Sequence, residues 1–503
     1  MYNYDSTDLR SVTVTAVTAD GVETTYTYDA NGNRASQTTG AVTTTYTYNK
    51  ANLVTGMFNI LLNDDGEDVV ISEFAYTYYA DGNQRTKTET LLGGDPVTTT
   101  YVYDGLGRLT AETKGEDSIT YTYDAGGNRV GMNRNGTVTA YAYDANNRLL
   151  SETVGDTVTT YTYDANGNTL TAGDKTYTYN DRGQQTGYSN GTTAASYAYN
   201  PSGLRKAKTV GGSTKYFVYN GMNIVYEYSE SVADGVTYFY GLNRTHNSEG
   251  EIYVYNAHGD VVQLVKDNSV VASYTYDAFG NLTSQIGESD NPFLYCGEYF
   301  DAETQTYYLR ARCYNPANGR FTQQDAWAFM DTSDPLSLNL YTYCCNNPIS
   351  YIDYSGNFVI SVLAASIIAG AVIGGVLGGV SGYAKAKSTG ATNKQALQSA
   401  AYGAVVGSLT GALLGMVGGY TVTAFTGVAA ISISASGVAV ASYSSPWLLD
   451  AFTRGYELER AFGGMCNNFP TIDKFTEVGN HVITDMTSIK SMDLSTVTYQ
   501  TGN

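Results

Sequence analysis

A tyrosine-rich unit recurs along the first half of the sequence, and its spacing constrains the fold more than any other feature. The unit has the form Y-x-Y-D-x-x-G-N, as in "YTYDANGNR" at Tyr26 and "YTYDAGGNR" at Tyr121, and it returns every 20 residues from Tyr101 to Tyr161. Looser copies continue to Tyr274. A fixed period of this length is the signature of a repeat architecture, in which one supersecondary unit is expected per repeat.

Each unit predicts a β-hairpin. In "TTYTYD" the two tyrosines lie two residues apart, so they face one side of a strand and the threonines face the other. "DANG" and "DAGG" supply residues that tolerate the positive φ of tight turns. A hairpin cannot bury its tyrosine face alone, so neighbouring hairpins are expected to pair into one long sheet. Periodicity alone leaves a closed shell and an open solenoid or adhesive stalk as equal alternatives.

Charge and cysteine usage exclude some function classes. The 503 residues contain 28 Lys and Arg against 48 Asp and Glu, a net charge of −20, so the repeat region is not expected to bind nucleic acid. Five cysteines without a C-x-x-C spacing predict neither a disulfide framework nor a zinc site. The start, "MYNYDSTDLR", lacks the basic and apolar regions of a signal peptide and opens on a repeat unit. We therefore expect a piece of a longer protein, or export by a route without a cleavable signal.

The repeat resembles that of YD-repeat or Rhs (rearrangement hot spot) proteins, and the resemblance covers residues 1–292. It implies a mainly β fold in which the hairpins wind into a hollow, cocoon-like shell around a C-terminal passenger. Residues 293–357 resemble the Rhs-associated core that closes this shell, in "YYLRARCYNPANGRFTQQD" and "NLYTYCCNNPISYIDYSGN".

In the Rhs family this core acts as an intramolecular aspartic protease, and the resemblance carries three residues over. Asp325 takes the first catalytic position, Asp353 the second, and Arg312 that of a supporting arginine. The chemistry needs two carboxylates that share one proton, so that one activates water and the other polarises the scissile carbonyl. The implied cut lies between Asn357 and Phe358, and it would free the passenger.

Two departures from the family pattern stand at the aspartates. Ala326 follows Asp325 and Tyr354 follows Asp353, where the family has proline, so both turns are expected to be less constrained. Gly356 is kept. Without the resemblance, Asp325 is interpreted as a turn or capping residue and "DYSG" as an ordinary β-turn.

The histidines carry no recognisable catalytic pattern. His246 and His258 stand apart from any Cys or Ser nucleophile at a familiar spacing, so surface or shell packing is expected of both. His481 is expected at the surface.

Residues 358–450 are apolar and rich in glycine. "FVISVLAASIIAGAVIGGVLGGVSGY" has no charge and is long enough to cross a bilayer, and a second apolar stretch follows, so 358–443 could insert into a membrane. Glycines at four-residue spacing allow helices to approach closely. We expect a helical pre-toxin region, which acts as a translocation helper, as a pore, or as cargo packed against the inside of the shell.

Residues 451–503 resemble the opening of a nuclease-like toxin module, with "FPTIDKF" and "TSIKSMDL" as the matching stretches, and we expect a short α/β fragment there. Asp473, Ser488 and Lys490 are the candidate site, where a carboxylate would hold a divalent metal and the lysine would steady the attacking water. Ser488 replaces an acidic residue, and the sequence ends at Asn503, before a nuclease of typical domain size would be complete.

Together these features predict the C-terminal part of a bacterial Rhs-type polymorphic toxin for interbacterial competition, secreted or at the cell surface. Its expected partners are its own cargo, an immunity protein, secretion machinery and a target membrane. No cofactor is expected for the shell and core. The alternatives are a non-catalytic YD-repeat adhesion or carbohydrate-binding protein with a membrane anchor, and a pore-forming effector.

Overall fold

The computed structural model describes residues 2–5, 13–326, 335–357 and 359–362, together with the backbone of five strands between 423 and 493. The chain divides into two units, Met1–Gly415 and Met416–Asn503, and each is described by itself.

An antiparallel meander of 28 strands forms the described part of the first unit up to residue 287, and each strand pairs with the next one along the chain. In chain order the strands are β1 (Tyr2–Asp5), β2 (Thr13–Ala19), β3 (Val22–Tyr28), β4 (Arg34–Thr39), β5 (Val42–Tyr48), β6 (Val54–Leu62), β7 (Asp68–Tyr78), β8 (Gln84–Leu91), β9 (Val97–Tyr103), β10 (Leu109–Lys114), β11 (Asp117–Tyr123), β12 (Arg129–Arg134), β13 (Thr137–Tyr143), β14 (Leu149–Val154), β15 (Thr157–Tyr163), β16 (Thr169–Ala172), β17 (Lys175–Tyr179), β18 (Gln185–Ser189), β19 (Ala194–Tyr199), β20 (Arg205–Val210), β21 (Ser213–Asn220), β22 (Asn223–Tyr228), β23 (Val236–Tyr240), β24 (Arg244–Asn247), β25 (Ile252–Tyr255), β26 (Val261–Lys266), β27 (Ser269–Tyr276) and β28 (Leu282–Gly287). A short 3-10 helix, η1 (Val232–Asp234), lies between β22 and β23.

The D-x-x-G-N part of each unit forms its turn through local hydrogen bonds. In one unit, Asp124 Oδ1 accepts from the Asn128 backbone amide at 2.8 Å, and Asp124 Oδ2 accepts from Asn128 Nδ2 at 3.0 Å. Gly127 takes a φ of +75°, which glycine adopts without strain. The aspartate therefore fixes the turn that the sequence pattern predicts.

The two tyrosines of a unit have different roles. The first is buried, as Tyr121 is at 3% exposure, and it supplies the apolar face of the sheet. The second reaches back to the preceding unit: the Tyr123 hydroxyl donates to the Leu109 carbonyl at 2.6 Å, and that of Tyr143 donates to the Arg129 carbonyl at 2.7 Å. Each of these two repeats is thereby tied to the one before it across 14 residues.

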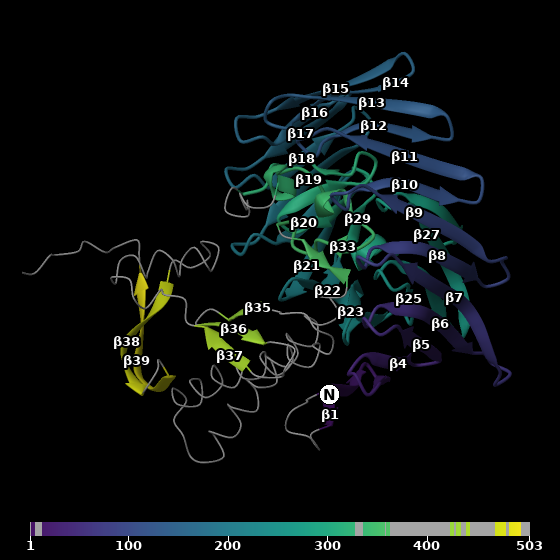
Figure 1. Ribbon diagram of the computed structural model, residues 1–503, viewed down its shortest axis with the longest axis vertical. Coiled ribbons are helices and arrows are strands. Elements are labelled where there is room, and N and C mark those ends of the chain that lie inside the picture. Colours follow the sequence, from purple (N-terminus) through teal and green to yellow (C-terminus); the bar gives the residue numbers. More distant parts are fainter. Residues whose placement is uncertain are drawn as a thin grey trace, which may run out of the picture. The chain divides into compact units, whose positions relative to one another are not determined.

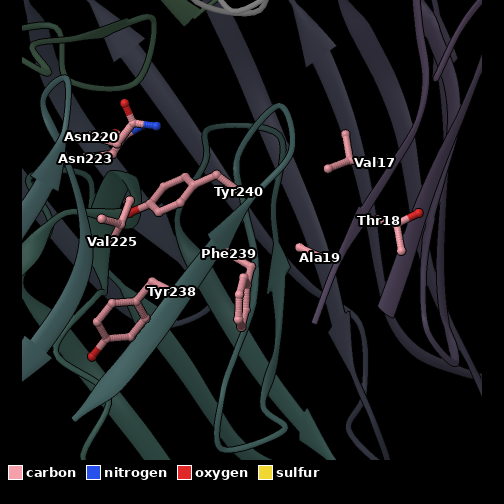
Figure 2. Close-up of a pocket in the computed structure, with 9 residues that line it drawn as sticks. All are labelled: Val17, Thr18, Ala19, Asn220, Asn223, Val225, Tyr238, Phe239 and Tyr240. Atoms are coloured by element: carbon pink, nitrogen blue, oxygen red, sulfur yellow. The ribbon is translucent and has the colours of Figure 1, made fainter. Parts of the chain in front are cut away.

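The sheet curves until its last strands lie against its first ones. Figure 1 shows the strands in sequence order from β4 up to β14 and back from β16 to β23. Asn59 Nδ2 on β6 donates to the Tyr255 carbonyl on β25 at 3.2 Å, and Gln263 Nε2 on β26 donates to the Ile71 carbonyl on β7 at 2.9 Å. The predicted shell-like β architecture is therefore confirmed.

Residues 293–357, the closing segment, pack along a row of the sheet's turns. Asn339 Nδ2 donates to the Gly126 carbonyl at 2.9 Å, and the Tyr341 hydroxyl donates to the Gly167 carbonyl at 2.8 Å. Its described residues, 293–326 and 335–357, contain a four-stranded sheet, three 3-10 helices and the first strand of a hairpin: β29 (Tyr299–Asp301), β30 (Thr306–Leu309), β31 (Arg312–Asn315), β32 (Arg320–Phe321), η2 (Tyr295–Gly297), η4 (Pro335–Leu338), η5 (Cys344–Asn346) and β33 (Tyr351–Ile352), which pairs with β34 (Ile360–Ser361).

A buried ion network also fixes this segment to the shell. Arg205 on β20 is 1% exposed and binds both carboxylate oxygens of Asp301 on β29, at 2.6 and 3.0 Å. Lys208 Nζ contacts Asp301 at 3.0 Å and Glu303 at 3.1 Å. Each buried charge in the network thus has an opposite partner.

The second unit is described as strand backbone. A three-stranded antiparallel sheet comprises β35 (Thr423–Thr426), β36 (Ala429–Ile433) and β37 (Ala439–Ser442), and β38 (Asn468–Val478) pairs with β39 (Val482–Asp493). The chain is therefore extended over Thr423–Thr426, Ala429–Ile433 and Ala439–Ser442, where we expected helix, because β-branched residues alternate with small ones there, as in "AISI". The remainder of 358–450 lies almost wholly outside the described residues. Among the residues that are described, no helix has the length and hydropathy of a membrane span.

Candidate functional site

The predicted cleavage point lies in the turn of a short hairpin. Strand β33 pairs with β34 through Tyr351 with Ser361 and Ile352 with Ile360, so the chain reverses its direction between Ile352 and Ile360. Asn357 is half-buried in this turn. Phe358 lies outside the described residues.

Arg312 is held at the start of β31 by contacts along its whole length. Its guanidinium carbon lies 3.6 Å from the centre of the Phe321 ring, and Nη1 donates to the Leu340 carbonyl at 3.0 Å. Its Nε donates to the carbonyl of Gly356, inside the hairpin turn. The arginine therefore connects β31 directly to the loop that contains the predicted cut.

The structure brings all three predicted residues of the core together. Arg312 Nη2 lies 2.7 Å from Asp325 Oδ2 and 3.7 Å from Asp353 Oδ2. The side chains of Arg312, Asp325 and Asp353 are 6%, 10% and 1% exposed. One buried cation thus faces two buried carboxylates, which is the arrangement that lets two acids hold different protonation states.

Asp353 presents two different oxygens. Oδ1 accepts hydrogen bonds from the backbone amides of Ser355, Gly356 and Asn357 at 3.1, 2.8 and 3.3 Å. Oδ2 has no hydrogen-bond partner and faces Arg312. Burial raises the pKa of Asp353, against the opposing effects of Arg312 and the three amides. One oxygen is therefore fixed by the turn, and the other is free to accept or donate a proton.

The carboxyl of Asp325 has a raised pKa in the fold. Burial raises its pKa to about 6, opposed by Arg312 and by the Ala326 amide, and the nearby Asp353 carboxylate raises it further. The Ala326 amide donates to Asp325 Oδ1 at 2.8 Å. A proline at this position has no N–H to donate, so the departure from the family pattern adds a hydrogen bond to the carboxylate.

Gly356 fits the site because it has no side chain. Its φ is +71°, and a Cβ there would lie 2.5 Å from the Leu309 carbonyl oxygen and 2.9 Å from the Arg312 amide nitrogen. Both neighbours are backbone atoms that cannot rotate away. The glycine of "DYSG" therefore lets the loop approach Arg312.

Sequence reasoning missed Arg310. It sits at the two-residue turn between β30 and β31, and its Nη1 donates to the Tyr354 carbonyl at 2.9 Å and pairs with the buried Glu298. Together with Arg312, it gives the hairpin turn two guanidinium groups. The signal available was the R-x-R spacing in "YYLRARCY", which places both arginines around one tight turn.

The other candidate residues have different outcomes. On the backbone, β38 and β39 place Lys474 opposite Ser488 and Thr471 opposite Lys490, with a bulge at Asp473, so the candidate toxin residues share one strand pair. His481 lies outside the described residues.

The two histidines of the shell are both in packed surroundings. His246 is 3% exposed and stacks on Phe239 with ring centres 4.6 Å apart, as packing predicts. His258 is not isolated, contrary to the sequence interpretation: Cys296 Sγ lies 3.8 Å from its Nδ1. The fold brings this pair together from positions 38 residues apart.

The sequence matches the family described as Teneurin YD-shell over residues 62–349, more than half of the chain. The chain belongs to the teneurin YD-shell family. The matched range runs from the end of β6 to just before β33, so the YD-shell match takes in most of the meander and of the closing segment. The predicted YD-repeat membership is confirmed.

Relatives of this YD-shell chain include much longer proteins. It is 32% identical over 326 residues to the tRNA3(Ser)-specific nuclease WapA of Bacillus spizizenii, and 32% identical over 325 residues to the tRNA nuclease WapA of Bacillus subtilis. Each match covers 62% of this chain and 12% of the relative. The chain is also 33% identical, over a shorter stretch of 118 residues, to the salivary gland surface protein 1 of Aedes aegypti.

Among solved structures, the Photorhabdus luminescens Tc holotoxin pore shares the shell fold. It matches with a TM-score of 0.53 and 18% identity, and the match covers 69% of this chain and 19% of that one. This chain is thus a YD-shell protein related to WapA, and its fold is similar to that of a part of the Tc holotoxin pore.

Proposed function

We propose that this YD-shell is the self-cleaving, C-terminal part of a secreted bacterial toxin of the Rhs type. The observation that carries the proposal is the position of Arg312, Asp325 and Asp353 against the hairpin turn of residues 353–357. A purely structural turn does not require two buried carboxylates around one arginine, because burying charge is costly.

In the proposed reaction the two carboxylates share one proton, and Arg312 offsets the remaining negative charge. The ionised carboxylate takes a proton from a water molecule, and the resulting hydroxide attacks the carbonyl carbon of Asn357. The protonated carboxylate donates its proton to the carbonyl oxygen. The tetrahedral intermediate then collapses: its hydroxyl returns a proton to the second carboxylate, the C–N bond breaks, and the amine of Phe358 takes the proton that the first carboxylate had accepted from water. Arg310 and Arg312 position the loop through the Tyr354 and Gly356 carbonyls.

The test is expression of the full chain followed by a denaturing gel and N-terminal sequencing. Wild type is expected to give two fragments that sum to 54.1 kDa, the smaller one starting at Phe358. Asp325→Asn and Asp353→Asn should leave the chain intact, whereas Asp290→Asn, a matched control outside the site, should be cleaved like wild type. An uncut wild-type chain with native circular dichroism would refute the proposal.

The segment released by this cut is proposed to be the effector, held by the shell until cleavage. The WapA relatives are named as tRNA nucleases, which supports a nuclease, with a divalent metal at Asp473, Ser488 and Lys490. Action between competing bacteria, an immunity protein, secretion machinery and passage of 358–443 through a target membrane complete the proposal. Adding tRNA and magnesium to the full-length natural protein tests the nuclease, and intact tRNA would argue for a different effector.

A further inference from the structure

A second cluster of reactive side chains lies at a different point of the closing segment. His258 and Asp260 belong to the turn between β25 and β26, and Cys296 belongs to η2, the first turn of the closing segment. His258 Nδ1 lies 2.9 Å from Asp260 Oδ1 and 3.8 Å from Cys296 Sγ. One nitrogen, one oxygen and one sulfur thus converge within 4.8 Å of one another.

These spacings suit a single tetrahedral zinc ion. Bond lengths of about 2.0–2.1 Å to nitrogen and oxygen and about 2.3 Å to sulfur place neighbouring ligand atoms roughly 3.3–3.6 Å apart. The observed separations from His258 Nδ1, 2.9 Å to Asp260 Oδ1 and 3.8 Å to Cys296 Sγ, straddle that range. The third separation, between the Asp260 carboxylate and Cys296 Sγ, is at most 4.8 Å, and rotation of these two side chains would bring it into the same range.

The groups around the three donors are arranged to support a metal. Asp260 Oδ2 accepts from Asn256 Nδ2 at 2.8 Å, and Oδ1 also accepts from the Cys296 amide at 2.9 Å, so the carboxylate is fixed on both sides. The Tyr343 hydroxyl lies 3.7 Å from Cys296 Sγ and can donate to a thiolate. Such outer hydrogen bonds orient metal ligands and tune their basicity.

The cluster is sheltered from solvent and from competing cations. His258 and Asp260 side chains are 13% and 8% exposed, and Cys296 is 7% exposed. Lys87 is the nearby cation that acts on Asp260, and its ammonium is already paired with Glu89 at 3.0 Å. A divalent ion would therefore meet two anionic donors, and on binding it would displace the proton of His258, which is otherwise paired with Asp260.

We propose that His258, Asp260 and Cys296 form a zinc site that fastens the closing segment to the shell, with water in the fourth position. A thiolate donor disfavours magnesium and calcium, and nitrogen and sulfur donors together favour zinc. The sequence predicts no cofactor for the shell and core, so this zinc ion is an addition to that prediction.

The same contacts could serve as a metal-free ion pair of His258 with Asp260, with Cys296 as a neutral neighbour. The two arrangements differ in a measurable way. A metal binds the sulfur as a thiolate and is lost when the sulfur is removed, whereas the ion pair leaves the sulfur as a thiol and does not depend on it.

The test uses the full chain, purified with reductant, stripped with a chelator and dialysed against zinc or cobalt(II). We expect one equivalent of metal per chain, a thiolate-to-cobalt absorption band, and a rise in melting temperature on adding zinc. Cys296→Ser should abolish the band, and both Cys296→Ser and His258→Asn should weaken zinc binding at least tenfold. Cys313→Ser and Cys466→Ser are the matched controls, and they should retain both the cobalt absorption band and the wild-type affinity for zinc.

Native circular dichroism of each variant separates loss of metal from loss of fold. Wild type that binds no metal under these conditions, or a cobalt band that persists in folded Cys296→Ser, would overturn the zinc site. If Cys296→Ser does not fold, folded His258→Asn decides: tight zinc binding in that variant overturns the proposal, and its loss supports it. The readouts do not involve self-cleavage, so this test and that of the proposed function succeed or fail separately.

Discussion

Replacing Arg205 by methionine should reveal how strongly the closing segment is fixed to the shell. Arg205 is 1% exposed and makes two hydrogen bonds to Asp301, which is also 1% exposed. Its guanidinium carbon also lies 4.2 Å from the centre of the Tyr308 ring. Methionine keeps much of the side-chain volume but leaves Asp301 as a buried carboxylate with Lys208 as its remaining cation.

The expected loss follows from that geometry. Removing one member of a buried ion pair costs about 3–5 kcal/mol, and the surviving contact of Lys208 with Asp301 at 3.0 Å places this case near 3 kcal/mol. Replacing both ions, in Arg205→Met with Asp301→Leu, should restore most of the stability because no unpaired charge stays buried. Arg148, which is 30% exposed and pairs with Asp144, itself 19% exposed, gives the control with a partly exposed pair, where Arg148→Met should cost less than about 1 kcal/mol.

Urea unfolding followed by circular dichroism measures these differences. Arg205 and Lys208 lower the pKa of Asp301 in the fold, so its stabilising contribution is present above about pH 4 and is lost as pH falls through the lower folded value. The difference between wild type and Arg205→Met should therefore shrink in acid. A loss below about 1 kcal/mol at pH 7, or a double variant no more stable than Arg205→Met, would refute this reasoning.

Three further results are expected. Gly356→Ala should stop self-cleavage in a chain that is otherwise folded, because its Cβ would meet backbone at 2.5 Å; cleavage at the wild-type rate on a gel would contradict this. Cleavage of refolded chain should slow between pH 5 and pH 8, because the carboxyl of Asp325, with its pKa of about 6, loses its proton over that range; a rate that rises steadily to pH 8 would exclude it as the acid. Gly167→Ala should cost at least about 1 kcal/mol more than Gly136→Ala in urea unfolding. Both glycines have positive φ, but only the first would place a Cβ 2.4 Å from the Tyr341 hydroxyl, and equal losses would show that this contact yields freely.

The repeat was predictable from sequence because its stabilising contacts are local. The Asp124 to Asn128 hydrogen bonds lie within five residues, and the tyrosine hydroxyls reach only 14 residues back. Turn chemistry and period therefore contain almost all the information needed for a hairpin and its neighbour.

Contacts between distant parts of the chain were not predictable in the same way. The Gln263 side-chain amide donates to the Ile71 carbonyl, 192 residues away in the sequence, and no local sequence pattern predicts that hydrogen bond. The grouping of Arg312 with Asp325 and Asp353 came from family resemblance, and the two extra contacts of the site, from Arg310 and Ala326, came only from the geometry. The expectation of helix over 423–442 rested on apolar composition and gave too little weight to β-branched alternation.

The closing segment contacts a row of turns in the meander, and these contacts constrain how many repeats can lie between those turns. Asn339 donates a hydrogen bond to the Gly126 carbonyl, Arg320 to the Asn147 carbonyl, and the Tyr341 hydroxyl to the Gly167 carbonyl. Three successive turns of the meander therefore each contact a different residue of the closing segment. Outside this stretch the closing segment is also fixed to the meander, by Asn347 at Asn83 and by Asp301 at Arg205. Between Gly126 and Gly167, one added or missing 20-residue repeat would move each later turn away from its contact in the closing segment. These contacts therefore fix the number of repeats in this stretch.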